Sequence, residues 1–218
     1  MSDITDAATY WDAYAARTAA HAAEEPAFGW TQYPHWGPGR ELLGSPRTAL
    51  ELGCGRGDAV AALAGAGVDA TGIDLSGEQH EYAQRRWGEV DGARFVQADV
   101  TEFLSRTQQQ WDAVYSIWGA VWFTDPAGLL PLVHDRLAPG GTLVFSHAPP
   151  VPGAYGVQGM YANGFKGKAV FVYRWSYEPG QWAALLGEFG FTGINARVQP
   201  APDDGLVGTL IVQAHRGG

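Results

Sequence analysis

Cysteine, lysine and long apolar runs are scarce or absent in this sequence of 218 residues. The single cysteine, Cys54, excludes an intramolecular disulfide and the cysteine clusters of structural zinc sites, so we expect no metal and a reducing cytoplasm. Lysine occurs only as Lys166 and Lys168, and a chain without a basic run is not expected to bind nucleic acid. No apolar run of about 18 residues occurs, and residues 1–10 lack the basic start of a secretory signal, so we expect no membrane association.

The chain is instead acidic and rich in aromatic residues. It carries 14 Lys plus Arg against 23 Asp plus Glu, a formal net charge of −9, and it has 9 Trp, 9 Tyr and 9 Phe. A domain of this size buries about 70% of the surface of its unfolded chain, so its core needs no partner, and we expect a monomer or homodimer. Several aromatics lie in Gly- and Pro-rich stretches, where we expect them to line a ligand cavity.

The order of patterns along the chain predicts a single domain. Residues 1–46 form an N-terminal cap, and residues 47–148 alternate short apolar runs with helical runs, which is typical of a parallel sheet with crossover helices. Residues 149–177 form a Gly-, Pro- and Tyr-rich insertion expected to cover the substrate, and residues 178–218 contain a helix and a hairpin. The predicted strands are 48–52, 68–73, 93–97, 113–117, 142–147, 193–199 and 205–214, and the predicted helices are 4–23, 58–66, 77–88, 101–107, 127–137 and 179–189.

These elements together predict an α/β protein. The expected architecture is a Rossmann-like three-layer sandwich, with a seven-stranded, mostly parallel sheet, a C-terminal antiparallel hairpin and an N-terminal helical cap.

The most informative segment is a glycine-rich turn after the first strand. Residues 51–57 read ELGCGRG, so the glycine spacing is G-x-G-x-G, and Asp58 stands where a dinucleotide fingerprint has its third glycine. Glycines at the carboxyl end of this strand let the backbone approach a ligand closely. An acid at Asp58 would repel a pyrophosphate, and Glu51 ahead of the turn suits a ligand that carries positive charge and an amino group.

This segment and three others resemble the core of the class I S-adenosylmethionine-dependent methyltransferases. The run 72–76, GIDLS, is similar to the family's ribose site and makes Asp74 the ligand of both ribose hydroxyls. The run 97–100, QADV, is similar to its adenine site, in which Asp99 accepts from the amino group while Leu75 and Val100 cover the ring. The runs 111–118 and 137–143 resemble the fourth strand and the turn before the fifth. The resemblance implies S-adenosylmethionine as cofactor, bound by Tyr10, Tyr14, Glu51, Gly53, Cys54, Gly55, Asp74, Leu75, Asp99, Val100 and Ser116.

Methyl transfer from a sulfonium is an in-line displacement with a neutral leaving group, so a general base is optional. His147 leaves a strand at the open end of the sheet and is the preferred candidate, although a strand-end histidine can simply bond to backbone; His35 is the second candidate. Substrate-facing aromatics are expected after the fourth strand, in the insertion and in the cap, which favours a flat, apolar or cationic acceptor. They are Trp118, Trp122, Tyr155, Tyr161, Phe165, Trp11, Trp30, Tyr33 and Trp36.

Three functions remain open at this stage. The first is methyl transfer to an oxygen or nitrogen atom of a small aromatic or apolar metabolite, and the second is N-methylation of a peptide or amino acid. The third, a nicotinamide-dependent oxidoreductase, is disfavoured by the glycine spacing and by the terminal hairpin.

Overall fold

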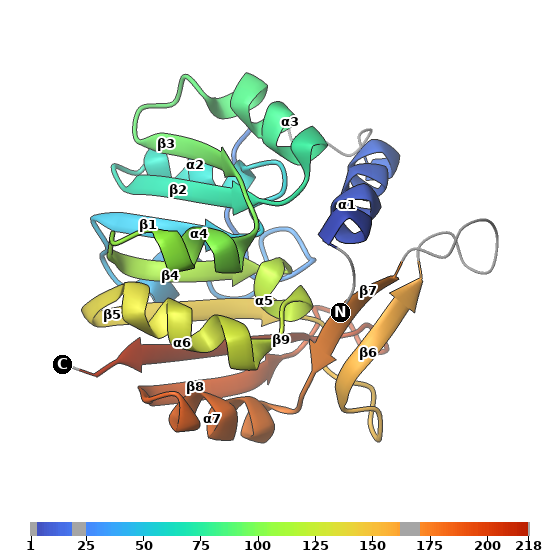
Figure 1. Ribbon diagram of the computed structural model, residues 1–218. Helices are drawn as coiled ribbons and strands as arrows, with labels where there is room; N and C mark the ends of the chain where they lie inside the picture. Colours follow the sequence, from blue (N-terminus) through green and yellow to red (C-terminus); the bar gives the residue numbers. More distant parts are fainter. Residues whose placement is uncertain (1–3, 19–24, 162–170, 218) are drawn as a thin grey trace.

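The protein folds around a seven-stranded sheet, shown in Figure 1. The computed structural model describes residues 4–18, 25–161 and 171–217. The strand order is β3-β2-β1-β4-β5-β9-β8; the first five strands run parallel, and β9 pairs antiparallel with both β5 and β8. This confirms the predicted fold class. The strands are β1 (Thr48–Leu52), β2 (Asp69–Asp74), β3 (Ala93–Gln97), β4 (Trp111–Ile117), β5 (Leu137–His147), β8 (Phe191–Gln199) and β9 (Thr209–Arg216).

Helices cover both faces of the sheet, because the central strands alternate between two apolar cores. In β1, Leu50 and Leu52 face one core, which α4, α6 and α7 complete, while Ala49 faces the other, which α2 and α3 complete. The helices are α1 (Ile4–Thr18), α2 (Asp58–Ala64), α3 (Gly77–Trp87), α4 (Val100–Arg106), α5 (Ala120–Phe123), α6 (Pro126–Arg136), α7 (Pro179–Glu188) and the 3-10 helix η2 (Arg40–Leu43).

Three segments differ from the sequence prediction. The insertion contains a separate antiparallel hairpin of β6 (Gly156–Tyr161) and β7 (Phe171–Ser176), where no strand was predicted. The short helix α5 follows β4 directly and was not predicted. Helix α1 is described only as far as Thr18, and the rest of the predicted helix, up to residue 23, lies outside the described residues.

Helix α1 and strand β7 stand together beside the sheet, at the edge where the parallel strands end (Figure 1). Helix α1 packs against α3 and β7, and β7 also packs against α5. These elements therefore enclose the ends of the strands that carry the predicted site. None of the helices within the described ranges is long and apolar enough to span a bilayer.

Candidate active site

A cavity of about 640 Å³ lies at the carboxyl ends of β1 to β4. Its floor is the turn after β1, and its walls come from the ends of β2, β3 and β4 and from α1, α5 and β7. This volume is within the range of about 300–1,000 Å³ that is usual for small-molecule sites. Open parallel α/β sheets bind ligands at this same edge, so the cavity lies where the topology predicts a site.

The glycine turn forms the floor because two backbone segments approach each other closely. Gly53 has a φ of +77°, and a Cβ added there would lie 2.4 Å from the backbone nitrogen of Ala120. A Cβ on Gly119 would lie 2.6 Å from the carbonyl oxygens of Leu52 and Gly53. Both glycines are therefore required for the start of α5 to pack on the turn after β1.

Asp74, at the end of β2, is held in position by backbone donors. Its Oδ2 accepts from the Gly55 amide at 2.7 Å, and its Oδ1 accepts from the Ser76 amide at 2.9 Å. Burial raises the pKa of Asp74 above its usual value, and the two amide bonds act in the opposite direction. The carboxylate thus ties the glycine turn to β2 while it lines the cavity.

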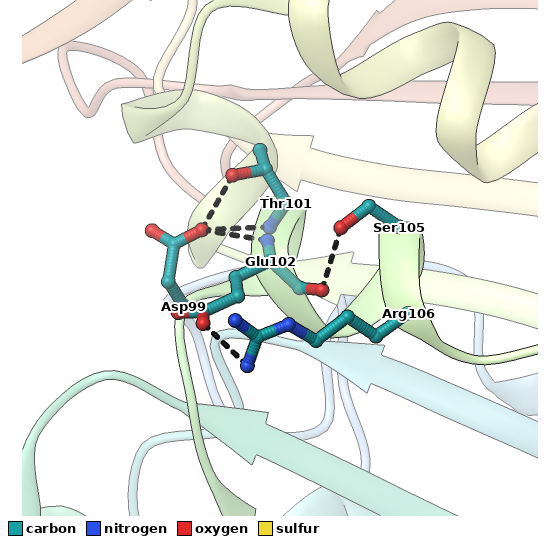
Figure 2. Close-up of polar contacts among 5 residues, drawn as sticks. All are labelled: Asp99, Thr101, Glu102, Ser105 and Arg106. Carbon is teal, nitrogen blue, oxygen red and sulfur yellow. Dashed lines mark hydrogen bonds and ion pairs between the residues drawn. The ribbon is translucent and has the colours of Figure 1, made fainter.

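Asp99 also forms hydrogen bonds that stabilise the fold, and it lines the cavity. Its Oδ1 caps α4 by accepting from the amides of Thr101 at 2.9 Å and Glu102 at 3.0 Å, and from the Thr101 hydroxyl at 2.5 Å. Figure 2 shows that its other oxygen takes no part in these bonds, while Glu102 pairs with Arg106 farther along the helix. Leu75 and Val100 line the cavity beside Asp99, as predicted for apolar partners of a ring.

Glu51 lies near the end of β1, and Cys54 lies in the glycine turn that follows. Glu51 is 3% exposed and lines a smaller cavity of about 170 Å³, with Cys54 and Asp58, instead of the main one. Burial raises the pKa of the Glu51 carboxyl and of the Cys54 thiol well above their usual values. The thiol is therefore not an activated nucleophile, and Cys54, like Gly53 and Gly55, contributes to the wall of the main cavity.

Helix α1 covers the cavity and is anchored by polar contacts. Asp12 Oδ1 accepts from the Ser76 hydroxyl at 2.6 Å and from the Glu78 amide at 3.4 Å, next to the Asp74 segment. The Arg56 guanidinium donates to the Thr18 hydroxyl at 3.2 Å and to the carbonyl of Ala15 at 3.5 Å. The helix is thus fastened to the two segments that hold the glycine turn and Asp74.

Besides Glu51, two further residues of the predicted cofactor site lie outside the main cavity. Tyr14 lines the cavity, but Tyr10, one turn earlier, is buried against Val172, and this burial raises the pKa of its phenol. Ser116 is 1% exposed, and its hydroxyl donates to the Leu52 carbonyl at 2.7 Å. Tyr10 and Ser116 therefore support the walls without contacting the space inside.

The structure places neither candidate base in the cavity. His147 is fully buried, its Nδ1 lies 2.7 Å from the Ala148 carbonyl oxygen, and its ring stacks on Trp122 at 5.2 Å. Desolvation lowers the pKa of His147 to about 4, which favours the neutral ring. His35 is exposed in the loop before η2, with a φ of +60°, and does not line the cavity. The base role is not supported for either residue.

The aromatic wall differs in part from the predicted one. Trp11 and Trp118 line the cavity as predicted, and Trp11 packs on Phe123 of α5 with ring centroids 4.6 Å apart. Phe123, Tyr173 and Trp175 also line the cavity and were not predicted, although the alternate positions of Tyr173 and Trp175 are a strand signal within the insertion 149–177. The predicted aromatics that do not line the cavity are Trp30, Tyr33, Trp36, Trp122 and Tyr155; Phe165 and the side chain of Tyr161 lie outside the described residues.

The N-terminal loop aromatics instead hold the loop to the body of the protein. Trp30 is fully buried and its indole N–H donates to the Gly39 carbonyl at 2.8 Å. The Tyr33 hydroxyl donates to the Val207 carbonyl at 2.8 Å, and the Trp36 indole donates to the Pro200 carbonyl at 2.8 Å. These bonds account for the polar ends of all three side chains, so no ligand is needed to explain their positions.

The charged groups of the cavity are mainly acidic. Four carboxylates, those of Asp58, Asp74, Asp99 and Asp125, line its described part together with the single guanidinium of Arg56. The Arg56 guanidinium also lies over the Tyr82 ring, 5.1 Å from its centroid. The cavity therefore favours a ligand that carries positive charge.

The comparisons with known proteins agree with this geometry. A family model described as a methyltransferase domain matches residues 49–141. Trans-aconitate 2-methyltransferase of Paracidovorax citrulli is 34% identical over 113 residues, which cover 49% of this chain and 42% of that protein. Ubiquinone biosynthesis O-methyltransferase of Bordetella avium is 31% identical over 144 residues, 64% of this chain and 56% of that protein. The chain thus matches about half the length of these curated relatives.

Solved structures share the fold over nearly the whole chain. Burkholderia thailandensis 1,6-didemethyltoxoflavin-N1-methyltransferase, solved with 1,6-didemethyltoxoflavin and S-adenosylhomocysteine, has a TM-score of 0.62 at 22% identity and covers 99% of this chain and 82% of that one. DhpI in complex with S-adenosylhomocysteine has a TM-score of 0.66 at 20% identity and covers 98% of this chain and 97% of that one.

Proposed function

We propose that this chain is a class I S-adenosylmethionine-dependent methyltransferase and that it transfers the methyl group of S-adenosylmethionine to an oxygen or nitrogen atom of a small aromatic or apolar acceptor. The observation that carries the proposal is the fixed Asp74 carboxylate at the end of β2, inside an acidic cavity. The comparisons do not favour the peptide N-methyltransferase or the nicotinamide-dependent oxidoreductase.

Asp74 fits a vicinal diol. An ionised carboxylate has about four lone-pair positions, and the amides of Gly55 and Ser76 use one on each oxygen. One position on each oxygen is left for the two hydroxyls of a ribose. Because both amides fix the carboxylate before a ligand arrives, little side-chain entropy is lost on binding.

Asp99 fits an adenine amino group in a similar way. Its Oδ1 is occupied by the start of α4, so its Oδ2 is the oxygen available to accept from a ligand. Leu75 and Val100 offer apolar surface beside it for a flat ring. We therefore propose that Asp74, Asp99, Leu75 and Val100 hold the nucleoside, with Gly53, Cys54 and Gly55 at the amino-acid end and Tyr14 as part of the cover.

When bound, S-adenosylmethionine supplies an electrophilic methyl group on a positively charged sulfur. The chain's part is to align the acceptor with that methyl and to exclude water. Ile117 and Trp118 line the cavity at the end of β4, while Trp11 and Phe123 close it from the side of α1 and α5. Tyr10, Glu51 and Ser116 support these walls, and neither His147 nor His35 is proposed as a base.

Isothermal titration with S-adenosylhomocysteine and, separately, NAD tests the cofactor part of the proposal. We expect S-adenosylhomocysteine to bind and NAD not to bind. Asp74→Ala removes hydrogen bonds to a charged acceptor, a loss of about 2 kcal/mol or about 30-fold in affinity. Asp91→Ala removes an exposed acid between α3 and β3 and is the matched control. Circular dichroism establishes that each variant is folded. Binding of NAD alone, or equal affinity of the two variants, would reject the proposal.

A further inference from the structure

The cavity has an acceptor side that is distinct from the strand ends that carry Asp74 and Asp99. This side is formed by α1, α5 and β7, and its wall is apolar and aromatic. Trp11, Phe123 and Trp175 are only partly buried, and Tyr173 is 38% exposed, so their ring surfaces remain available to a ligand. Rings of this kind bind flat molecules by stacking and bind cations over their faces.

The charges around this wall disfavour an anion. Four carboxylates line the described cavity, and the one guanidinium, that of Arg56, is bonded to Thr18 and to the Ala15 carbonyl. A bound cofactor with one net positive charge leaves the lining acidic. Asp125 is an exposed residue of the lining, at the mouth of the cavity, and it caps α6 through Oδ1, at 3.0 Å from the Ala127 amide. A carboxylate-bearing acceptor would meet this field on entry and when bound.

The described lining offers carboxylates, which are weak bases at neutral pH, and lacks a stronger base such as an imidazole or an amine. Neither histidine nor lysine occurs among the described residues that line the cavity, and His147 lies buried behind Trp122. Phenols and alcohols need such a base before they attack. A ring nitrogen or an arylamine that is unprotonated at neutral pH already has a free lone pair and needs none.

We infer that the acceptor is a flat, uncharged nitrogen compound, either a nitrogen heterocycle or an arylamine, and that carboxylate acceptors are excluded; this inference rests on the proposed function. The nitrogen lone pair forms the new N–C bond, while the C–S bond breaks and its electron pair stays on sulfur. Positive charge thus moves from sulfur to nitrogen, and the acidic lining stabilises it before and after transfer. If the nitrogen carries a hydrogen, the proton leaves to water afterwards.

Three bicyclic probes of equal size and different charge test the inference. Quinoline has an uncharged ring nitrogen, 2-naphthol has a hydroxyl, and 2-naphthoate has a carboxylate. Each is titrated into protein saturated with S-adenosylhomocysteine, with tryptophan fluorescence as the readout. We expect the affinity for quinoline to be at least about tenfold higher than that for 2-naphthoate. This is the factor expected for the repulsion between two like charges at roughly 10 Å in an effective dielectric of about 20. With S-adenosylmethionine, mass spectrometry should detect N-methylquinolinium and neither a methyl ether nor a methyl ester.

A pair of variants assigns the discrimination to the cavity. Asp125→Asn keeps the cap on α6 and removes the charge at the mouth, so the ratio of quinoline to 2-naphthoate affinity should fall by about threefold. Asp135→Asn removes an exposed charge near the other end of the same helix and should leave the ratio unchanged. Equal binding of 2-naphthoate, formation of an ether or ester, or failure of all three probes to bind loaded protein would overturn the inference. Failure to bind S-adenosylhomocysteine would reject the proposed function instead.

Discussion

Replacing His147 should remove a large part of the acid sensitivity of this fold. The side chain is fully buried between aromatic rings, stacked on Trp122 with the ring planes 5° apart and 6.0 Å from the Phe145 centroid. Desolvation lowers its pKa from 6.5 to about 4, against the opposing effect of the Ala148 carbonyl and with a smaller lowering effect from Arg174. The folded protein therefore holds a neutral imidazole under conditions in which the unfolded chain holds a charged one.

The sign and size of the effect follow from proton linkage. Between pH 6.5 and about 4 the unfolded chain binds a proton that the folded protein does not, so acid favours unfolding. The contribution of His147 to the free energy of unfolding is complete above pH 6.5 and declines as the pH falls toward 4. One pKa unit corresponds to about 1.4 kcal/mol, so the full window is worth about 3 kcal/mol. The group is buried, so solvent screening reduces this value little.

Urea denaturation at pH 7.5, 6.5, 5.5 and 4.5 measures the effect. We expect the wild type to lose about 2.5 kcal/mol more stability than His147→Phe over this range, because phenylalanine fills the aromatic site without a titrating group. His35→Asn is the control, since this exposed residue has a φ of +60°, which asparagine tolerates. The same pH dependence in wild type and His147→Phe would refute the linkage argument. His147→Phe should also still bind S-adenosylhomocysteine, because the side chain does not line the cavity.

Three further changes test the site. Gly53→Ala should abolish binding of S-adenosylhomocysteine, because its Cβ would collide with the backbone of α5. Gly55 also has a positive φ, but the space around its Cβ position is open. Gly55→Ala should therefore lose only about 1–2 kcal/mol of stability, measured by urea denaturation. Asp12→Ala should increase hydrogen exchange in α1 about tenfold or more through loss of the bond to Ser76, while the melting temperature changes little. Affinity for S-adenosylhomocysteine should be measured by titration from pH 8 to 4. As the pH is lowered, the affinity should begin to fall at a pH above the usual pKa of an aspartate, because burial raises the pKa of Asp74 and the protonated carboxyl loses an acceptor. Constant affinity throughout that range would contradict the role of Asp74.

The sheet and the cofactor side of the cavity could be predicted from the sequence because both depend on local patterns. Strand periodicity and helix caps place the ends of β2 and β3 at one edge, and an acid at a strand end must lie at that edge whatever the rest of the chain does. Asp74 and Asp99 therefore line the cavity as predicted. Gly53 was predictable for the same reason, since close backbone approach requires glycine at a fixed place after a strand.

His147 was misplaced because the strand alternation was not followed to its end. Leu143 and Phe145 belong to one core, and His147 is the next residue on the same face of β5. Ser116, near the end of β4, is a similar case: it shares a face with Val114, so its hydroxyl is directed to the interior and bonds to the Leu52 carbonyl. In both cases the period-two alternation of the strand predicts that the side chain faces the core. Proximity to the open edge of the sheet was the weaker indication of its direction.

The acceptor side could not be predicted because it depends on contacts between distant segments. Tyr173 and Trp175 alternate in the sequence, but only the pairing of β7 with β6 and its packing on α1 and α5 place them at the cavity. The loop aromatics gave the opposite error: Trp30 and Trp36 occur in a glycine-rich segment that resembles a cover, yet their indoles bond to backbone carbonyls elsewhere. An aromatic in an irregular segment therefore does not by itself indicate a ligand cavity.

The acids of the proposed cofactor site also have structural roles. Asp74 ties the glycine turn to β2, and Asp99 caps α4, so each is held by backbone amides before any ligand is present. These bonds offset the cost of burying a charge, and they leave acceptor positions on both oxygens of Asp74 and on Oδ2 of Asp99. The same bonds that stabilise the fold therefore orient the carboxylate oxygens that we propose to bind the cofactor. A site built in this way needs no rearrangement of either carboxylate on binding, and its charge is already arranged to receive a cation.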